Sequence, residues 1–434
     1  MSTPRILLLA GSVPSEKDVG GLILHDLIRL YPRDRICCFA IDEADHGSAK
    51  ADLDWLPLHV ENVPSSSGAQ WSDGIRGRIV THCRYRYRRA VYLPQLTRRV
   101  VEFGAAHRVE LVWAVLNRPS LYRMAPAVAA QLGVPLVVTI WDPPESVCLN
   151  HRLDRFSRSV AQRDFDHAMR TAKRCAVMCE AMRDEYRARY GVETVIMRNG
   201  ISLRYRRPVA TRPNDDGHLT IGFCGALYAT REWRALLSAL ASVNWRIDGR
   251  DVRVRAFTTS ICGNLHSRAC IEWLGWRPPA EVIELLSESD VNYLPYWFDP
   301  RRRSAVRLCF PAKLTTYLAS GRPVFFHGPS DSSPARFFDR FPVAACCHSL
   351  DEAEIVGTLE RLVGDRALYE RATAAIDAAI DEELNLNVSR ARFAELIGVE
   401  EHELLPVTAV RPPRKRDRTD FRTGARRIGR SSTT

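Results

Sequence analysis

The stretch from Cys309 to Phe326 reads Cys-Phe-Pro-Ala-Lys-Leu-Thr-Thr-Tyr-Leu-Ala-Ser-Gly-Arg-Pro-Val-Phe-Phe. Pro311 suits the first turn of a helix, because its missing N–H would be unpaired there anyway. Gly321 suits the end of that helix, because glycine enters the left-handed cap conformation freely. The apolar run from Pro323 to Phe326 then predicts a buried strand. This stretch therefore predicts a helix followed directly by a strand, as in an α/β protein.

Lys313 is the unusual residue of this stretch, because it falls in the first turn of the predicted helix. A helix dipole already places positive charge at that end, so a cation there is unfavourable unless an anion is bound. Free N–H groups together with an ammonium make a good phosphate site. The alternative is that Lys313 extends into solvent, and the local pattern does not separate the two interpretations.

The pattern Pro-x-Lys-Leu-x-x-Tyr-x-Ala-x-Gly-x-Pro-Val resembles the donor-site helix of family-4-like glycosyltransferases (glycosyl transferases group 1), which have the GT-B fold. Weaker motifs of that family occur in the same order over most of residues 1–400. They are Arg5–Gly11, Gly20-Gly21, Cys179–Met182, Arg198–Ile201, Ile221–Gly225 followed by Arg231, Trp273–Trp276 and Asp290–Pro295.

The hydrophobic pattern independently predicts two doubly wound α/β domains. Short apolar runs without alternation are typical of parallel strands that are covered on both faces, and helical runs lie between them. The predicted strands are Ile6–Ala10, Ile36–Ile41, Leu111–Leu116, Leu136–Trp141, Cys175–Met178 and Thr194–Met197, then Thr220–Cys224, Val252–Phe257, Ile271–Leu274, Val291–Leu294 and Pro323–Phe326. The polar, proline-containing residues 202–218 separate the two sets and are interpreted as a linker.

These patterns divide the chain into four parts. Residues 1–201 are predicted to form a Rossmann-like acceptor domain and residues 202–384 a Rossmann-like donor domain, facing each other across a cleft. The resemblance implies that a helix within 385–405 packs back on the first domain. Residues 406–434 are rich in Pro, Arg, Ser and Thr, so we expect a disordered basic tail.

The net charge of +11 is concentrated in two places. Residues 407–434 hold nine Lys and Arg against two Asp, and residues 76–99 hold eight Arg and no acidic residue. The rest of the chain carries a formal charge of −4, so nucleic acid is not an expected partner. No Gly-x-Gly-x-x-Gly or Walker A sequence is present, which argues against a dehydrogenase or an ATPase.

The cysteine pattern and the hydropathy predict a cytoplasmic protein. None of the twelve cysteines forms a Cys-x-x-Cys pair, and many lie in apolar strand-like runs, as reduced core residues do. No apolar run approaches the roughly 20 residues that cross a bilayer, and the first strand is too short for a secretory leader.

A nucleotide-sugar donor needs its diphosphate neutralised as it leaves, either by a metal or by basic side chains. The Asp-x-Asp sequence from Asp52 to Asp54 lies in a surface-like acidic stretch and no convincing metal-binding pair is found, so no metal and no other cofactor is expected beyond the nucleoside-diphosphate sugar itself. The basic side chains are Lys313 and Arg231, and the resemblance places Arg231 where the family has a phosphate-binding lysine. The alternative for Arg231 is a solvated residue that caps a helix.

The resemblance implies further donor-binding residues, namely Gly225, Trp276, Arg277, Pro311, Ala312, Leu314 and Thr316. Two positions depart from the family pattern. Thr316 stands where relatives often carry a Glu that binds the donor ribose, and Ala226 stands where many carry an Arg beside the diphosphate. Arginines of the preceding loop could supply the missing charge or simply be solvated; they are Arg301, Arg302, Arg303 and Arg307.

On the acceptor side, Gly20 and Gly21 are predicted to lie in a loop between the first strand and its helix, where glycine lets a ligand approach the backbone. Asp142 ends a predicted strand and could orient an acceptor hydroxyl or act as a base, or it could cap the following turn. The resemblance implies an anomer-retaining reaction without a covalent nucleophile. An inverting route would need a base, for which Asp142 and His25 are the candidates.

The segment Arg76–Arg99 interleaves Arg with Tyr, Val and Ile. A basic, aromatic amphipathic helix suits an interfacial membrane contact, which would place the protein at the inner face of a membrane. The alternative is an ordinary amphipathic helix whose Arg face is solvated.

Taken together, the residues and the resemblance predict a glycosyltransferase that moves a hexose-type sugar from a nucleoside diphosphate to a glycan, a lipid-linked acceptor or a small molecule. The competing hypothesis is a GT-B-shaped scaffold that binds a glycan or a partner enzyme without transferring sugar, and Thr316 and Ala226 are the features in its favour. An epimerase or hydrolase would need an acid/base cluster that the sequence does not reveal.

Overall fold

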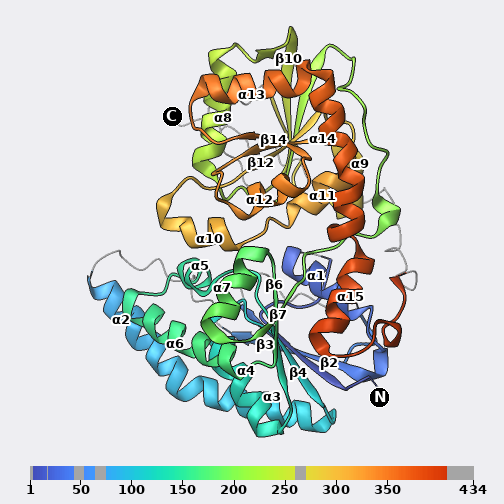
Figure 1. The fold of residues 1–434 in the computed structure, drawn as a ribbon. Coiled ribbons are helices and arrows are strands. Elements are labelled where there is room, and N and C mark those ends of the chain that lie inside the picture. Colours follow the sequence, from blue (N-terminus) through green and yellow to red (C-terminus); the bar gives the residue numbers. More distant parts are fainter. Residues whose placement is uncertain (1–2, 17, 44–52, 64–74, 260–269, 408–434) are drawn as a thin grey trace, which may run out of the picture.

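The computed structural model describes residues 3–16, 18–43, 53–63, 75–259 and 270–407, and it consists of two α/β domains stacked end to end (Figure 1). The first domain is built on a seven-stranded sheet that is parallel throughout, in the order β3-β2-β1-β4-β5-β6-β7. The order reverses between β1 and β4, which is the position where ligands bind in open α/β sheets. The strands are β1 Ile6–Ala10, β2 Ile36–Glu43, β3 Leu58–Val63, β4 Leu111–Val115, β5 Leu136–Thr139, β6 Arg174–Val177 and β7 Glu193–Ile196.

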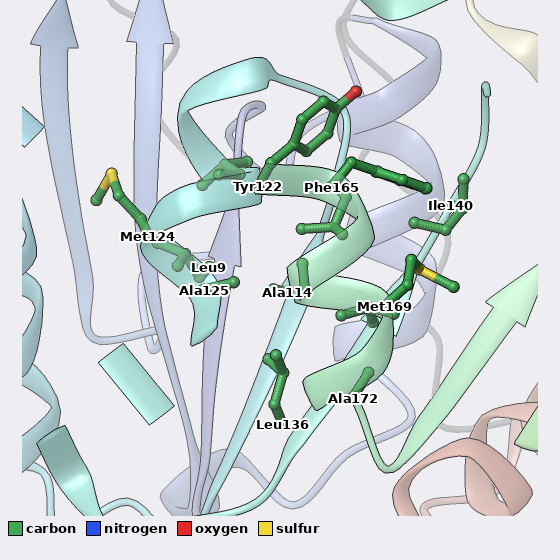
Figure 2. Close-up of a cluster of buried hydrophobic side chains, with 14 of the residues drawn as sticks. Leu9, Ala114, Tyr122, Met124, Ala125, Leu136, Ile140, Phe165, Met169 and Ala172 are labelled. Atoms are coloured by element: carbon green, nitrogen blue, oxygen red, sulfur yellow. The ribbon is translucent and has the colours of Figure 1, made fainter. Parts of the chain in front are cut away.

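Helices cover both faces of this sheet, so its central strands are buried and apolar on both sides. The helices are α1 Val19–Ile28, α2 Ile75–Tyr87, the π-helical turn η3 Arg88–Tyr92, α3 Leu93–Ala106, α4 Pro119–Leu132, α5 Pro144–Asn150, α6 Arg155–Thr171 and α7 Glu180–Tyr190. Figure 2 shows one of the two cores, where Tyr122 and Phe165 from facing helices lie over Leu9 and Ala114 of the sheet. The ring centroids of Tyr122 and Phe165 are 5.1 Å apart in an edge-to-face arrangement.

The second domain repeats the same winding, with the parallel order β11-β10-β8-β12-β13-β14 and a short antiparallel β9 beside β10. Its strands are β8 His218–Cys224, β9 Arg246–Ile247, β10 Arg250–Phe257, β11 Ile271–Trp273, β12 Val291–Pro295, β13 Val324–His327 and β14 Ala344–Cys347. Its helices are α8 Thr230–Ser242, α9 Pro279–Leu286, α10 Arg303–Leu308, α11 Lys313–Ala319, α12 Ser333–Arg340, α13 Glu352–Gly364 and α14 Arg366–Ala379. The reversal here lies between β8 and β12.

The chain returns to the first domain after α14 (Figure 1). A π-helical turn, η7 (Ile380–Leu384), ends at Asn385, whose side chain then caps α15 (Leu386–Ile397) by accepting from the amides of Asn387 and Val388. Phe393 of α15 packs on Trp113 of the first sheet, with ring centroids 4.7 Å apart. The predicted fold class is confirmed, including the helix that crosses back. The tail predicted to be disordered lies outside the described residues from 408 onward.

The stretch from Cys309 to Phe326 forms the predicted helix and strand, with small differences at the ends of these elements. The helix α11 begins at Lys313 rather than at Pro311, and Ala312 occupies the N-cap position. Gly321 has a φ of 73°, as a left-handed helix end requires, and a Cβ there would collide with the carbonyl of Pro208 in the linker. Three strands were not predicted from the sequence: β3, β9 and β14.

Candidate active site

Lys313 points back from α11 into the loop that follows β8, at the reversal of the second sheet. Its Nζ donates a hydrogen bond to the carbonyl oxygen of Ala226, at 3.1 Å. The same ammonium lies 4.4 Å from the ring centroid of Phe223 and 4.6 Å from that of Tyr228. Gly225 has a φ of 81°, and a Cβ there would lie 3.7 Å from Cε of Lys313. The end of β8 and the loop after it therefore surround the Lys313 ammonium with one carbonyl oxygen and two aromatic rings.

No carboxylate balances this ammonium: among the described residues, Lys313 forms no ion pair. Burial away from water lowers the pKa of Lys313 to about 8, and the nearby Cys224 opposes that fall. A half-buried cation without a counter-ion is costly, and it favours the binding of an anion.

Tyr228 and Trp297 form an aromatic wall beside Lys313 that the sequence did not reveal. Their ring centroids are 4.6 Å apart, and the indole N–H of Trp297 donates to the carbonyl of Tyr228 at 3.1 Å. The buried Glu232 accepts from the amide of Phe298 at 2.8 Å and holds the Trp297 loop in place. The phenol oxygen of Tyr228 is buried and has no hydrogen-bond partner in the described part of the chain.

Arg231 lies in the first turn of α8 and is exposed. Within the described residues, its guanidinium makes no hydrogen bond or ion pair, and no contact joins it to Lys313. It is therefore available at the edge of the Gly225 loop and does not cap α8, whose N-cap position is occupied by Ala229.

Trp276 and Arg277 follow β11 at the same edge of the sheet as Gly225, with β10 between the two strands. The Trp276 side chain is 54% exposed, which is unusual for an indole. Arg277 donates to the carbonyl of Trp276 at 3.0 Å and lies 3.4 Å from a carboxylate oxygen of Glu281. These two residues flank the Gly225 loop without touching Lys313 in any recorded contact.

The remaining donor-side residues belong to α11 and its approach. Pro311 and Leu314 are buried, whereas Ala312 and Thr316 are half-buried. The neighbouring Thr315 donates to the carbonyl of Asn199 in the first domain, at 2.9 Å, and so joins the two domains.

Two of the arginines that could have replaced the missing charge are held in surface ion pairs. Arg301 lies 3.0 Å from Asp299, and Arg303 lies 3.3 Å from Asp331. Arg302 stacks over Trp297, 5.2 Å from its ring centroid, and so adjoins the aromatic wall. This arrangement favours the solvated interpretation for Arg301 and Arg303.

Gly20 and Gly21 lie within the first turn of α1, so their predicted position in a preceding loop is wrong. Asp18 caps the helix by accepting from the amide of Gly21 at 2.8 Å, so α1 begins at Val19. A Cβ on Gly21 would lie 2.7 Å from the carbonyl oxygen of Val13, so local packing already requires glycine there. A Cβ on Gly20 would lie 3.1 Å from the Trp141 ring.

His25 is only 3% exposed, inside α1. Its Nδ1 lies 3.6 Å from a carboxylate oxygen of Asp26 and has no hydrogen-bond partner among the described residues. This burial makes His25 a poor candidate for a base that must reach an acceptor.

Asp142 follows β5 and faces the second domain. The thiol of Cys309 donates to its Oδ1 at 3.0 Å across the domain boundary. Burial raises the pKa of the Asp142 carboxyl, and the hydrogen bond from Cys309 opposes that rise. The next helix, α5, has Pro143 at its N-cap and no side-chain cap, which argues against the turn-capping role. The involvement of Cys309 was not predicted.

Two other kinds of feature are absent from the part of the chain that the structure describes. In residues 3–16, 18–43, 53–63, 75–259 and 270–407, no three His, Cys, Asp or Glu side chains are grouped as a metal site would need. Asp52 of the Asp-x-Asp sequence lies outside these ranges. Over the same ranges, no helix is long and apolar enough to cross a membrane.

The fold is similar to that of solved glycosyltransferases. HepE from Anabaena, crystallised with UDP, matches with a TM-score of 0.63 and 16% identity over 91% of this chain and 99% of that chain. Sucrose-phosphate synthase from Thermosynechococcus elongatus matches with a TM-score of 0.60 and 11% identity over 90% and 97% of the two chains. A trehalose 6-phosphate synthase from Burkholderia multivorans matches with a TM-score of 0.59 and 14% identity over 91% and 98%.

These similarities establish the GT-B fold, in which two Rossmann-like domains face each other. No protein-family model matches the sequence, and no curated protein matches it either.

Proposed function

We propose that this protein is a glycosyltransferase that takes a sugar from a nucleoside diphosphate. The observation that carries the proposal is the ammonium of Lys313, which is held at the reversal of the second sheet and forms no ion pair with any carboxylate of the described residues. A diphosphate supplies the missing negative charge. The glycosyltransferase fold agrees with this assignment, and HepE, which shares the fold, was crystallised with UDP and with UDP-glucose.

In this proposal the diphosphate binds between Lys313 and the Gly225 loop, and Arg231 contributes a second positive charge from α8. As the bond from the sugar to the phosphate breaks, negative charge develops on the leaving oxygen, and these two cations stabilise it. No metal takes part. The nucleoside lies toward the exposed Trp276 and the half-buried Arg277, which border the same edge of the sheet.

The acceptor approaches from the first domain in the same proposal. Asp142 lies at the domain boundary and orients the acceptor hydroxyl, which attacks the anomeric carbon of the sugar. In a retaining reaction the proton of that hydroxyl passes to the leaving phosphate oxygen, so Asp142 serves as a hydrogen-bond acceptor rather than as a base. The acceptor is a glycan, a lipid-linked sugar or a small molecule, and a peripheral contact with the inner face of a membrane would serve a lipid-linked one.

The inactive scaffold remains the second candidate, because Thr316 and Ala226 remove two groups that relatives use. The test is release of nucleoside diphosphate from UDP-, GDP-, ADP- and dTDP-glucose, with and without added sugar acceptors. Transfer predicts release that depends on one base and is lost in Asp142→Ala, while that variant still binds the nucleotide. Tight nucleotide binding without any release, with every donor and acceptor, would favour the scaffold.

A further inference from the structure

The outward face of α2 and η3 is apolar, which is the reverse of the usual pattern for a surface helix. Ile79 is 57% exposed, Val80 41%, Tyr87 64% and Val91 41%. With the exposed Cys83, these side chains recur every three or four residues and so share one side of the segment. We call this the apolar stripe.

The opposite side of the segment is already occupied by contacts with the first domain. Tyr85 and Tyr92 pack against its hydrophobic core. Arg89 forms a 2.7 Å ion pair with Asp164 of α6. The segment therefore packs on the first domain through other side chains, and the residues of the apolar stripe are not needed for that packing.

Phe156 extends the stripe onto the neighbouring helix. It lies in the first turn of α6 and is 71% exposed. Its ring centroid is 6.0 Å from that of His82, which follows Ile79 by three residues and so borders the stripe on α2. The helices α2 and α6 lie next to each other (Figure 1). An exposed apolar patch that is shared by two helices is typical of an interaction surface.

The charge around the stripe is positive. Residues 76–99 contain no acidic side chain, and Arg76 and Arg86 are exposed along it. Within the described residues, neither Arg76 nor Arg86 forms an ion pair. Three carboxylates on this side of the domain have other partners: Asp164 pairs with Arg89, Glu61 with Arg99, and Asp154 caps α6. A partner of this surface therefore meets apolar side chains flanked by two arginines that no described carboxylate neutralises.

We propose that the apolar stripe and Phe156 insert into the interface of an anionic lipid membrane while the flanking arginines bind lipid phosphates. Aliphatic and aromatic side chains with arginines along one helix suit the boundary between acyl chains and headgroups. A nucleic acid would pair with the arginines but would leave the aliphatic side chains exposed to water. An acidic protein surface would place the same aliphatic side chains next to charged groups. This inference does not depend on sugar transfer, because neither Lys313 nor Asp142 belongs to the surface.

The test is sedimentation of the full-length protein with vesicles of phosphatidylcholine alone and of phosphatidylcholine mixed with phosphatidylglycerol. The protein should sediment with the mixed vesicles only, and less so as salt is raised. Replacing Arg76 and Arg86 by Gln should weaken partitioning about 25-fold, because each arginine near an anionic surface contributes a factor of about five. Ile79→Ser with Tyr87→Ser should weaken it about tenfold.

Matched control variants distinguish binding through this surface from attraction of the whole basic protein to an anionic membrane. Leu203→Ser removes an exposed leucine elsewhere, and Arg371→Gln removes an exposed arginine of α14, so both should partition as the unaltered protein does. Equal partitioning of all variants, or no binding to mixed vesicles, would overturn the proposal. Dimerisation that Tyr87→Ser abolishes, without vesicle binding, would overturn it in favour of a second copy of the chain. Thermal denaturation confirms that every variant is folded.

Discussion

Lys313 holds its ammonium between the rings of Phe223 and Tyr228, and this arrangement works against stability. A cation–π contact contributes about 0.5 to 2 kcal/mol, whereas withdrawing an ammonium from water costs several kcal/mol. The lowered pKa of Lys313, about 8, reflects the same imbalance. A residue that is unfavourable for folding but sits in a ligand-binding position is best explained by the ligand.

Replacement of this lysine by an apolar side chain of similar length should therefore separate stability from function. We expect Lys313→Met to raise the free energy of unfolding by about 1 kcal/mol while weakening nucleotide binding at least tenfold. Thermal denaturation and calorimetric titration measure the two effects. A variant that is less stable and binds nucleotide normally would make Lys313 a structural residue.

Binding of a nucleoside diphosphate should also depend on pH. The pKa of Lys313 in the empty site is about 8, so the ammonium loses its proton as the pH rises through that value, and the diphosphate loses its partner. We expect affinity to be constant below pH 8 and to fall above it. Lys313→Arg keeps its charge and should bind with a flat profile over the same range. A fall of equal size in Lys313→Arg would assign the titration to another group.

The sequence drew attention to Lys313 as a candidate binding residue but did not reveal the side chains that surround it. Lys313 could be found because a cation in a first helical turn is unusual in itself. Tyr228, Trp297 and Cys309 could not be found in this way. Nothing in their local sequence shows that the loops of Tyr228 and Trp297 meet near Lys313, or that Cys309 contacts Asp142. The one hint in the sequence was Tyr228, which follows Gly225 by three residues. Its place beside Lys313 becomes apparent only in the folded protein.

At the scale of elements, the sequence predicted the strands that are buried on both faces and missed those that are not. The edge strand β3 is half-exposed along most of its length, so it lacks the continuous apolar run of the central strands. β14 reads Ala-Ala-Cys-Cys and is four residues long, with little β propensity. Gly20 and Gly21 were placed before the first helix because glycine lets a ligand approach the backbone, and the cap at Asp18, which starts the helix at Val19, was not recognised.

The junction between α11 and β13 depends on Gly321. A side chain there would be strained by the φ of 73° and would also collide with the carbonyl of Pro208 in the linker. We expect Gly321→Ala to lower the free energy of unfolding by about 3 kcal/mol. Gly191→Ala is the matched control, because its φ is 66° with open space around it, and it should cost only about 1 kcal/mol. Equal losses in a denaturant titration would show that the contact with the linker contributes nothing.

At the scale of the whole molecule, the two domains are joined through Arg198. Its side chain is 2% exposed, and its two terminal nitrogens lie 2.7 Å from Glu180 and 2.6 Å from Glu383. It also lies over Phe310 of the second domain, 4.8 Å from the ring centroid. Glu180 starts α7 in the first domain, whereas Glu383 belongs to the turn through which the chain returns.

Loss of this guanidinium should loosen the arrangement of the domains. We expect Arg198→Met to lower the free energy of unfolding by about 2 kcal/mol, because two carboxylates lose their partner, and to broaden the calorimetric transition as the domains unfold less cooperatively. The control is Arg340→Met, which removes a more exposed pair to Glu382 and Glu383 and should cost less than about 1 kcal/mol. An unchanged transition in Arg198→Met would mean that other contacts, such as that of Cys309 with Asp142, hold the domains together.

The central claim is that the Lys313 site binds a nucleoside diphosphate, and its most direct test is thermal stability with saturating UDP, GDP, dTDP and ADP in turn, without metal. A ligand at about 100 times its dissociation constant adds about 2.7 kcal/mol to the native state. We predict a clear rise in melting temperature for one of the four and no rise for Lys313→Met with the same nucleotide. No rise for any nucleotide, or an equal rise in Lys313→Met, would contradict the assignment of this site.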